Sequence, residues 1–225
     1  MFRAFLAGAL AALPLQLATV PFGAIFGALA VEAGMSLTQT MAMTSIVVAG
    51  ASQLVALQML IDGAPPLLIV AAAAFVNLRM AIYSAALALH WKGVGPWPRV
   101  LAAWFLNDQS YALSIRRYEA RAEAPPTRAG YFFGVGTCCL ACWITASLAG
   151  ALLGQRIPEG WPVEFAPALV FLALAVPFLK SRADWAVAVT SGGLAVILAG
   201  LPSGTGFLLA MAVGIAVGMV VSRHG

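Results

Sequence analysis

Long apolar runs separated by short polar connections make up nearly the whole chain. Each run supplies about the 20 apolar residues that a helical membrane span needs. Polar and apolar residues do not alternate within the runs, which argues against a transmembrane β-barrel. Reading from one helix breaker to the next predicts eight spans: residues 4–31, 37–61, 65–90, 99–115, 129–153, 165–180, 184–200 and 205–222.

The composition supports a membrane protein. The chain has 225 residues, of which 62% are hydrophobic and only 9% are charged, whereas soluble domains are about 25% charged. The N-terminal run continues to Val31 without a clear small-x-small cleavage site, so we interpret it as a first span and not as a signal peptide. We therefore predict an all-α polytopic membrane protein with a single transmembrane domain over residues 1–225.

The basic residues predict an orientation. An even number of spans puts both termini on one side of the membrane, and that side then carries most of the Lys and Arg, which indicates that both termini are cytoplasmic. Because the basic residues lie in short connections, no nucleic-acid partner is expected despite the net charge of +4. The N-terminal side is predicted to hold Arg3, Arg116, Arg117, Arg121, Arg128, Lys180, Arg182 and Arg223, and the other side Lys92, Arg99 and Arg156. Tryptophans at predicted span ends fit an aromatic belt: Trp91, Trp97, Trp161 and Trp185.

Polar residues and helix breakers gather inside the first four spans, so several spans are predicted to be discontinuous. A broken membrane helix exposes N–H groups that can hold a carboxylate and carbonyls that can hold an ammonium group or a cation. Such a broken segment could also be re-entrant, which would change the span count by one. The candidate substrate-binding residues from these segments are Pro21, Phe22, Gly23, Gly50, Ser52, Gln53, Asn77, Arg79, Asn107, Asp108 and Gln109.

Arg79 is the most demanding of these residues. It lies about ten residues from either end of its segment, and a charged side chain at that depth costs roughly 2.5–3.5 kcal/mol on insertion scales. It therefore needs an acid or an anionic ligand, and Asp108 is the favoured partner. A purely structural Arg79–Asp108 pair stays an alternative, as do a simple kink at Pro21, an interfacial Asp108, and interhelical hydrogen bonds for Gln53 and Asn77.

Small residues and cysteines have simpler interpretations. Four glycine pairs have the G-x-x-x-G spacing that allows close helix approach, and we expect most to pack within one subunit. Cys138, Cys139 and Cys142 lie in an apolar run without a second pair or a nearby His, so we expect packing residues and no metal site or cofactor. The glycine pairs are Gly23/Gly27, Gly130/Gly134, Gly150/Gly154 and Gly214/Gly218.

The same polar segments carry a family resemblance. "PFGAIFGALAVEAGMSLTQTMAMTSIVVAGASQLVALQML", "FVNLRMAIYS" and "NDQSYAL" resemble the AzlC family of branched-chain amino-acid permeases, as does the Gly-rich ending. The specific motifs lie before Leu113. The chain departs from the family pattern at Met80, where relatives have His, and at Gln109, where relatives have an acid, so coupling or substrate can differ.

The resemblance implies export of branched-chain or related apolar amino acids across the cytoplasmic (inner) membrane of a bacterium. It also implies a small hydrophobic partner subunit of the AzlD type. Together with the buried polar residues, it suggests a proton-linked secondary transporter that is not an enzyme. Residues 1–118 would form the substrate-site half, and the charge-poor residues 126–225 a possible partner interface. The alternatives are a passive channel for small zwitterionic solutes and a scaffold subunit with no transport of its own.

Overall fold

The computed structural model describes residues 1–154, 179–201 and 205–224, and these are helical with short connections. They form two compact units. The first contains residues 1–54 and 74–154, and the second contains residues 55–73 with the described part of the C-terminal region. The predicted span over 165–180 lies almost entirely outside the described residues, as do Arg156 and Trp161. The helices are α1 (Phe2–Glu32), α2 (Leu37–Ile46), α3 (Gly50–Ile61), α4 (Pro66–Val76), α5 (Leu78–His90), α6 (Pro96–Phe105), α7 (Asp108–Ala120), α8 (Pro125–Gly154), α10 (Arg182–Ile197) and α11 (Thr205–His224).

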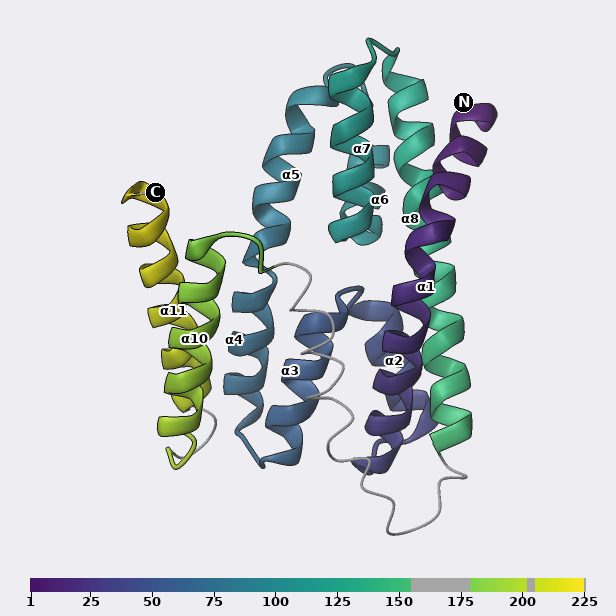
Figure 1. The fold of residues 1–225 in the computed structure, drawn as a ribbon. Helices are drawn as coiled ribbons and strands as arrows, with labels where there is room; N and C mark the ends of the chain where they lie inside the picture. Colours follow the sequence, from purple (N-terminus) through teal and green to yellow (C-terminus); the bar gives the residue numbers. More distant parts are fainter. Residues whose placement is uncertain (155–178, 202–204, 225) are drawn as a thin grey trace. The chain divides into compact units, whose positions relative to one another are not determined.

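Within the described residues, four helical stretches are long and apolar enough to cross a membrane. Two of them, α1 and α8, run side by side in the first unit (Figure 1). The third is α4 with α5, interrupted at Asn77, and the fourth lies in α11. The described residues thus confirm an all-helical membrane architecture, while the eight spans and their orientation stay predictions.

Glycines hold α1 and α8 together in parallel. Gly8 lies against the backbone of Tyr131, and Gly27 lies against that of Ser147. On α8, Gly134 faces Phe5 and Gly150 faces Ala24, so closely that an added Cβ would meet a backbone carbonyl oxygen. Small residues let the two backbones approach, which is how helices associate in lipid where the hydrophobic effect gives little driving force.

The glycine pairs therefore serve packing within the chain, as predicted. In the second unit, Gly214 faces Ser191 and Gly218 faces Val187, which joins α10 and α11 as antiparallel neighbours. A further apolar cluster in that unit contains Met59, Ala64 and Ala72.

Residues 99–115 do not form the predicted single span. The helices α6 and α7 form a hairpin whose outer ends lie together: the Arg99 guanidinium donates to the carbonyl of Trp91 (2.8 Å), and the Tyr118 ring lies 5.6 Å from that of His90. The hairpin turns back at Asn107 because this residue caps α7, accepting from the N–H groups of Gln109 and Ser110.

The predicted second span, 37–61, is also two helices. The chain leaves helical geometry after Ile46 and resumes it at Gly50, where α3 begins. The Gln53 side chain donates to the carbonyl of Met43 (3.0 Å), which ties the first turn of α3 back onto α2. The indole N–H of Trp104, at the end of α6, donates to the carbonyl of Ser45 (3.0 Å), so the ends of α2 and α6 meet.

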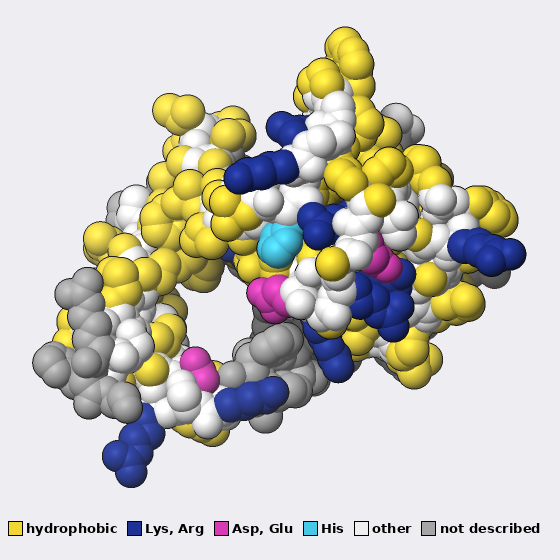
Figure 2. All heavy atoms as spheres, turned by 90° about the horizontal axis from the view of Figure 1, so that it is seen from above, with side chains coloured by type: hydrophobic (Ala, Val, Ile, Leu, Met, Phe, Trp, Pro, Cys, Tyr) yellow, Lys and Arg dark blue, Asp and Glu magenta, His cyan; other side chains and the backbone are white. Residues whose placement is uncertain are grey.

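The hairpin changes where two basic residues lie. The eight-span prediction put Lys92 and Arg99 on the side opposite Arg116 and Arg128, because it counted 99–115 as a crossing. In the structure the Arg128 guanidinium donates to the carbonyl of His90 (2.9 Å), and Gly93 packs against Pro125, so these residues share one end of the first unit. Figure 2 looks onto that end and shows Lys and Arg side chains gathered there.

Candidate transport site

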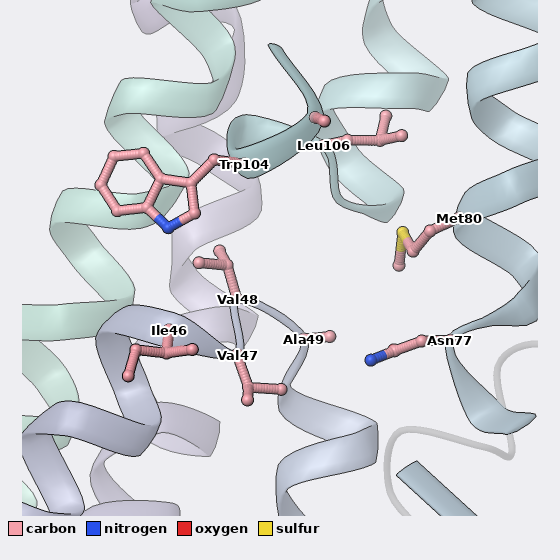
Figure 3. A pocket seen from close by; sticks show the side chains of 9 residues that line it. Ile46, Val47, Val48, Ala49, Asn77, Met80, Trp104 and Leu106 are labelled. Carbon is pink, nitrogen blue, oxygen red and sulfur yellow. The ribbon is translucent and has the colours of Figure 1, made fainter. Parts of the chain in front are cut away.

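Three helix interruptions meet at one cavity in the first unit. They are the Val47–Ala49 connection between α2 and α3, Asn77 between α4 and α5, and the Leu106–Asn107 connection between α6 and α7. The cavity has a volume of about 300 Å³ (Figure 3). It lies at the lower end of the range for small-molecule sites, roughly 300–1,000 Å³. Its lining residues are Ile46, Val47, Val48, Ala49, Asn77, Met80, Ala103, Trp104 and Leu106.

The cavity wall is apolar with one projecting amide. The side-chain nitrogen of Asn77 points towards Ala49, and the thioether of Met80 lies above it (Figure 3). The Asn77 side-chain oxygen is buried and has no hydrogen-bond partner within the described residues. A wall of this type suits a small apolar group, with the amide available to orient it.

Arg79 and Asp108 form an ion pair just beyond this cavity. The Arg79 Nη1 atom lies 3.0 Å from Asp108 Oδ1, and the two side chains are 34% and 50% exposed. Arg79 is in the first turn of α5, where the helix dipole disfavours a cation, while Asp108 is in the first turn of α7, where the dipole favours an anion. The predicted contact between these residues is therefore present, although neither lines the cavity itself.

The ion pair leaves donors of Arg79 and one acceptor of Asp108 without a partner within the described residues. Tyr83 also donates its hydroxyl to Asp108 Oδ1 (3.0 Å), so the same oxygen receives both bonds, and Asp108 Oδ2 is left without a partner within the described residues. The buried Arg79 Nε atom likewise has no partner there. Unpartnered donors on Arg79 and an unpartnered oxygen on Asp108 are the groups that a zwitterion would complement.

Gln109 belongs to a polar cluster that is separate from the ion pair. Its amide oxygen accepts from Gln16 (2.8 Å) and from the Cys139 thiol (2.9 Å), and its amide nitrogen donates to Thr19 (2.6 Å). Gln16 is itself buried. These bonds join α1, α7 and α8 and so hold the start of α7, where Asp108 lies. Gln109 does not face the cavity.

Two predicted residues at the start of α3 are fully buried. The Ser52 hydroxyl donates to the carbonyl of Ala49 (2.9 Å), while Gln53 bonds to Met43 and keeps an unpartnered side-chain oxygen. The first N–H groups of α3, from Gly50 onwards, have no acceptor within their own helix. They adjoin the cavity-lining residue Ala49, so the predicted half-helix N-terminus exists at Gly50.

The predicted break at Pro21 is wrong. The helix α1 is continuous from Phe2 to Glu32, with Pro21 inside it and exposed. Proline removes only one backbone donor, and close packing against α8 on both sides of this position keeps the helix intact. Phe22 and Gly23 pack against Trp143, with the Phe22 ring centroid 5.6 Å from the indole. Gly50 packs against the same two aromatic rings, so these rings lie against the start of α3. Phe22, Gly23 and Gly50 do not line the cavity.

Sequence reasoning missed Tyr83, Gln16 and Trp104. Tyr83 lies four residues after Arg79, one helical turn away, which is a spacing that places side chains on the same face. The pattern Asn107-x-x-Ser110 is a capping box, so it also marked the start of a helix at Asp108. No sequence signal pairs Trp104 with Ser45.

The comparisons with known proteins agree with this architecture. A family model described as AzlC protein matches residues 14–157. Over 200 residues the chain is 27% identical to an uncharacterized membrane protein of Archaeoglobus fulgidus, and the alignment covers 87% of this chain and 84% of that protein. No solved structure matches. The family and this relative indicate a membrane protein with a transport-related role. Because the family match covers more than half of the sequence, the chain belongs to the AzlC family.

Proposed function

We propose that this protein is a secondary transporter that exports branched-chain or related apolar amino acids across a bacterial cytoplasmic membrane. The observation that carries the proposal is the Arg79–Asp108 pair, with its unpartnered donors and acceptor, beside an apolar cavity at three helix interruptions. Ionisable residues inside an apolar membrane segment are costly and commonly mark a substrate or ion path.

The substrate would use both parts of this site. Its ammonium group would donate to Asp108 Oδ2, and its carboxylate would accept from Arg79 Nε or from the N–H groups at the start of α3. The aliphatic side chain would occupy the cavity lined by Val47, Met80 and Leu106. Because the zwitterion would satisfy groups that are otherwise left unpaired, binding would offset part of the cost of burying them.

Proton linkage follows from the same carboxylate. A proton on Asp108 would weaken its ion pair with Arg79 and would remove the acceptor for a substrate ammonium group. Binding of a proton and of substrate would then be mutually dependent, which is what coupled transport needs. We expect no enzymatic activity, and we expect the basic end of the first unit to face the cytoplasm.

A small hydrophobic subunit of the AzlD type is the expected partner. The glycines of α8 and α11 already pack within the chain, whereas Gly192 and Gly193 on α10 meet no atom within 4 Å, so the partner would contact α10 or other apolar surface. Expression with and without that subunit would separate a transporter from a scaffold subunit that is silent alone.

The test is efflux of labelled leucine, isoleucine and valine from preloaded cells. Arg79→Ala and Asp108→Asn should abolish saturable efflux, whereas the matched variants Arg182→Ala and Asp184→Asn, at the start of α10, should retain it at equal membrane levels. Efflux that rises linearly with concentration would instead indicate a passive channel. Saturable efflux that survives in both site variants would overturn the assignment of the site.

A further inference from the structure

One end of the first unit carries a dense group of cations. Because α6 and α7 form a hairpin, the turn between α5 and α6, the turn between α7 and α8, and the N-terminus all lie at this end. Figure 2 shows their dark blue side chains close together. The basic end is defined here by seven residues: Arg3, Lys92, Arg99, Arg116, Arg117, Arg121 and Arg128.

Three of the seven cations already have partners. Arg117 makes a two-pronged ion pair with Glu123, at 2.7 Å and 3.0 Å, and lies over the ring of Tyr131. Arg99 and Arg128 donate to backbone carbonyls, as described above. These three residues hold the turns in place, so part of their hydrogen-bonding capacity is used within the unit.

The other four cations are exposed and make no hydrogen bond or ion pair within the described residues: Arg3, Lys92, Arg116 and Arg121. Glu119 is an exposed acid at the same end, and its negative charge offsets that of only one of the four cations. The cations come from α1, from the turn after α5 and from α7, so the charge surrounds the end of the unit and is not confined to one helix.

Exposed aromatic and apolar side chains lie at the same level. Trp97, in the first turn of α6, is 80% exposed, and Phe2, next to Arg3, is 72% exposed. Tryptophan is enriched where a membrane meets water, at the depth of the lipid headgroups. Trp97 therefore indicates that Lys92 and its neighbours lie at headgroup depth, within reach of lipid phosphates.

We propose that the basic end binds anionic phospholipid headgroups of the surrounding leaflet. Unpaired Lys and Arg next to membrane spans gain about 1 kcal/mol each from an anionic surface at low salt, which is roughly a fivefold gain in affinity per cation. Lys92, Arg116 and Arg121 supply the phosphate contacts, and Trp97 lies between the headgroups and the acyl chains. Bound lipid would brace the outer ends of α6 and α7.

The test measures lipid retention by the purified full-length protein. The detergent-solubilised protein is titrated with phosphatidylglycerol or with phosphatidylcholine, and bound lipids are counted by native mass spectrometry. The triple variant Lys92→Gln/Arg116→Gln/Arg121→Gln is compared with the wild type. The double variant Lys180→Gln/Arg182→Gln is the control, because it removes two cations from the other unit.

The wild type should retain phosphatidylglycerol at least tenfold better than phosphatidylcholine, and the triple variant alone should lose most of that preference. Equal retention of both lipids by the wild type would overturn the proposal. So would a preference that survives in the triple variant or that falls as much in the control. Far-UV circular dichroism and gel filtration identify a misfolded triple variant, in which case the single variants Lys92→Gln and Arg116→Gln give the same comparison.

Discussion

At the residue scale, Asp108 is the centre of the candidate site. One of its oxygens accepts from both Arg79 and Tyr83, and the other has no partner within the described residues. Tyr83 is held in place by Tyr111, whose ring is stacked on it at 4.2 Å. The hydroxyl of Tyr83 therefore fixes the direction in which Asp108 presents its free oxygen.

Replacing Tyr83 tests this arrangement. Tyr83→Phe removes the hydroxyl but keeps the stacked ring, so a hydrogen bond worth about 1 kcal/mol is lost and the KM for leucine efflux should rise roughly fivefold. Tyr111→Phe is the matched control, since the Tyr111 hydroxyl makes no hydrogen bond within the described residues. An unchanged KM in Tyr83→Phe would show that this hydroxyl has no part in positioning Asp108.

The sequence predicted the Arg79–Asp108 contact because charge and depth leave few alternatives in an apolar chain. It did not predict that Gln109 turns away from the cavity, since that depends on Gln16 and Cys139, which are distant in sequence. The sequence also predicted a helix break at Pro21, which the structure does not have. The helix α1 stays continuous through the exposed Pro21, with α8 packed against Gly8, Gly23 and Gly27.

At the scale of elements, α1 and α8 form a glycine-lined pair. Gly134→Ala would place a Cβ against the carbonyl of Phe5, and overpacking of this type costs about 1–3 kcal/mol. Gly192→Ala, on α10, meets no atom within 4 Å and should be neutral or slightly stabilising, because alanine favours helix more than glycine does. Thermal unfolding in detergent compares the two variants, and equal melting temperatures would contradict the close packing.

The turn between α7 and α8 should respond to pH. The Arg117 guanidinium, hydrogen-bonded to Glu123, holds the pKa of that carboxyl below its ordinary value. The unfolded chain then binds the proton more readily, so the stability from this pair is present above about pH 4.3 and is lost as the pH falls through the lower pKa of the folded state.

Glu123→Gln should remove this acid-dependent loss of stability, whereas Glu119→Gln, at an exposed acid in the last turns of α7, should keep it. Melting temperatures measured between pH 3 and pH 7 make the comparison. The same pH dependence in wild type and Glu123→Gln would mean that the pair contributes nothing measurable to folding.

Helix type was predictable from apolar length, and re-entrant segments were left open as an alternative. Apolar length did not show that 99–115 is a hairpin or that 37–61 breaks after Ile46. A re-entrant pair and a single span contain similar numbers of apolar residues, so the segments 37–61 and 99–115 satisfied the same length rule as true spans. The distinction depends on tertiary bonds, such as Gln53 to Met43, and on the Asn107 cap, which fixes where the chain turns back.

At the scale of the whole molecule, the α6–α7 hairpin determines on which side of the membrane the adjoining turns lie. If α6 and α7 form a hairpin, Lys92 and Glu119 face the same side of the membrane, and Gly34, in the turn after α1, faces the other. A membrane-impermeant maleimide should then label Lys92→Cys and Glu119→Cys from the cytoplasmic side only, and Gly34→Cys from outside. The native sequence gives the background labelling. Labelling of Lys92→Cys and Glu119→Cys from opposite sides would restore a single crossing over 99–115.

Charge is arranged to match that topology. Apart from Arg79, the cations in the described part of the first unit lie at one end, as the positive-inside rule expects of a cytoplasmic end. In the proposed account, the cations at this end orient the protein and bind lipid headgroups, while Arg79 and Asp108 bind the solute.

The most direct test of the central claim is equilibrium binding of radiolabelled leucine to the purified protein. Wild type and Asp184→Asn should bind leucine saturably, and Asp108→Asn should bind it at least tenfold more weakly, because the carboxylate that meets the ammonium group is lost. If Asp108→Asn binds leucine as tightly as the wild type, the ion pair at the helix interruptions is structural and the substrate site lies elsewhere.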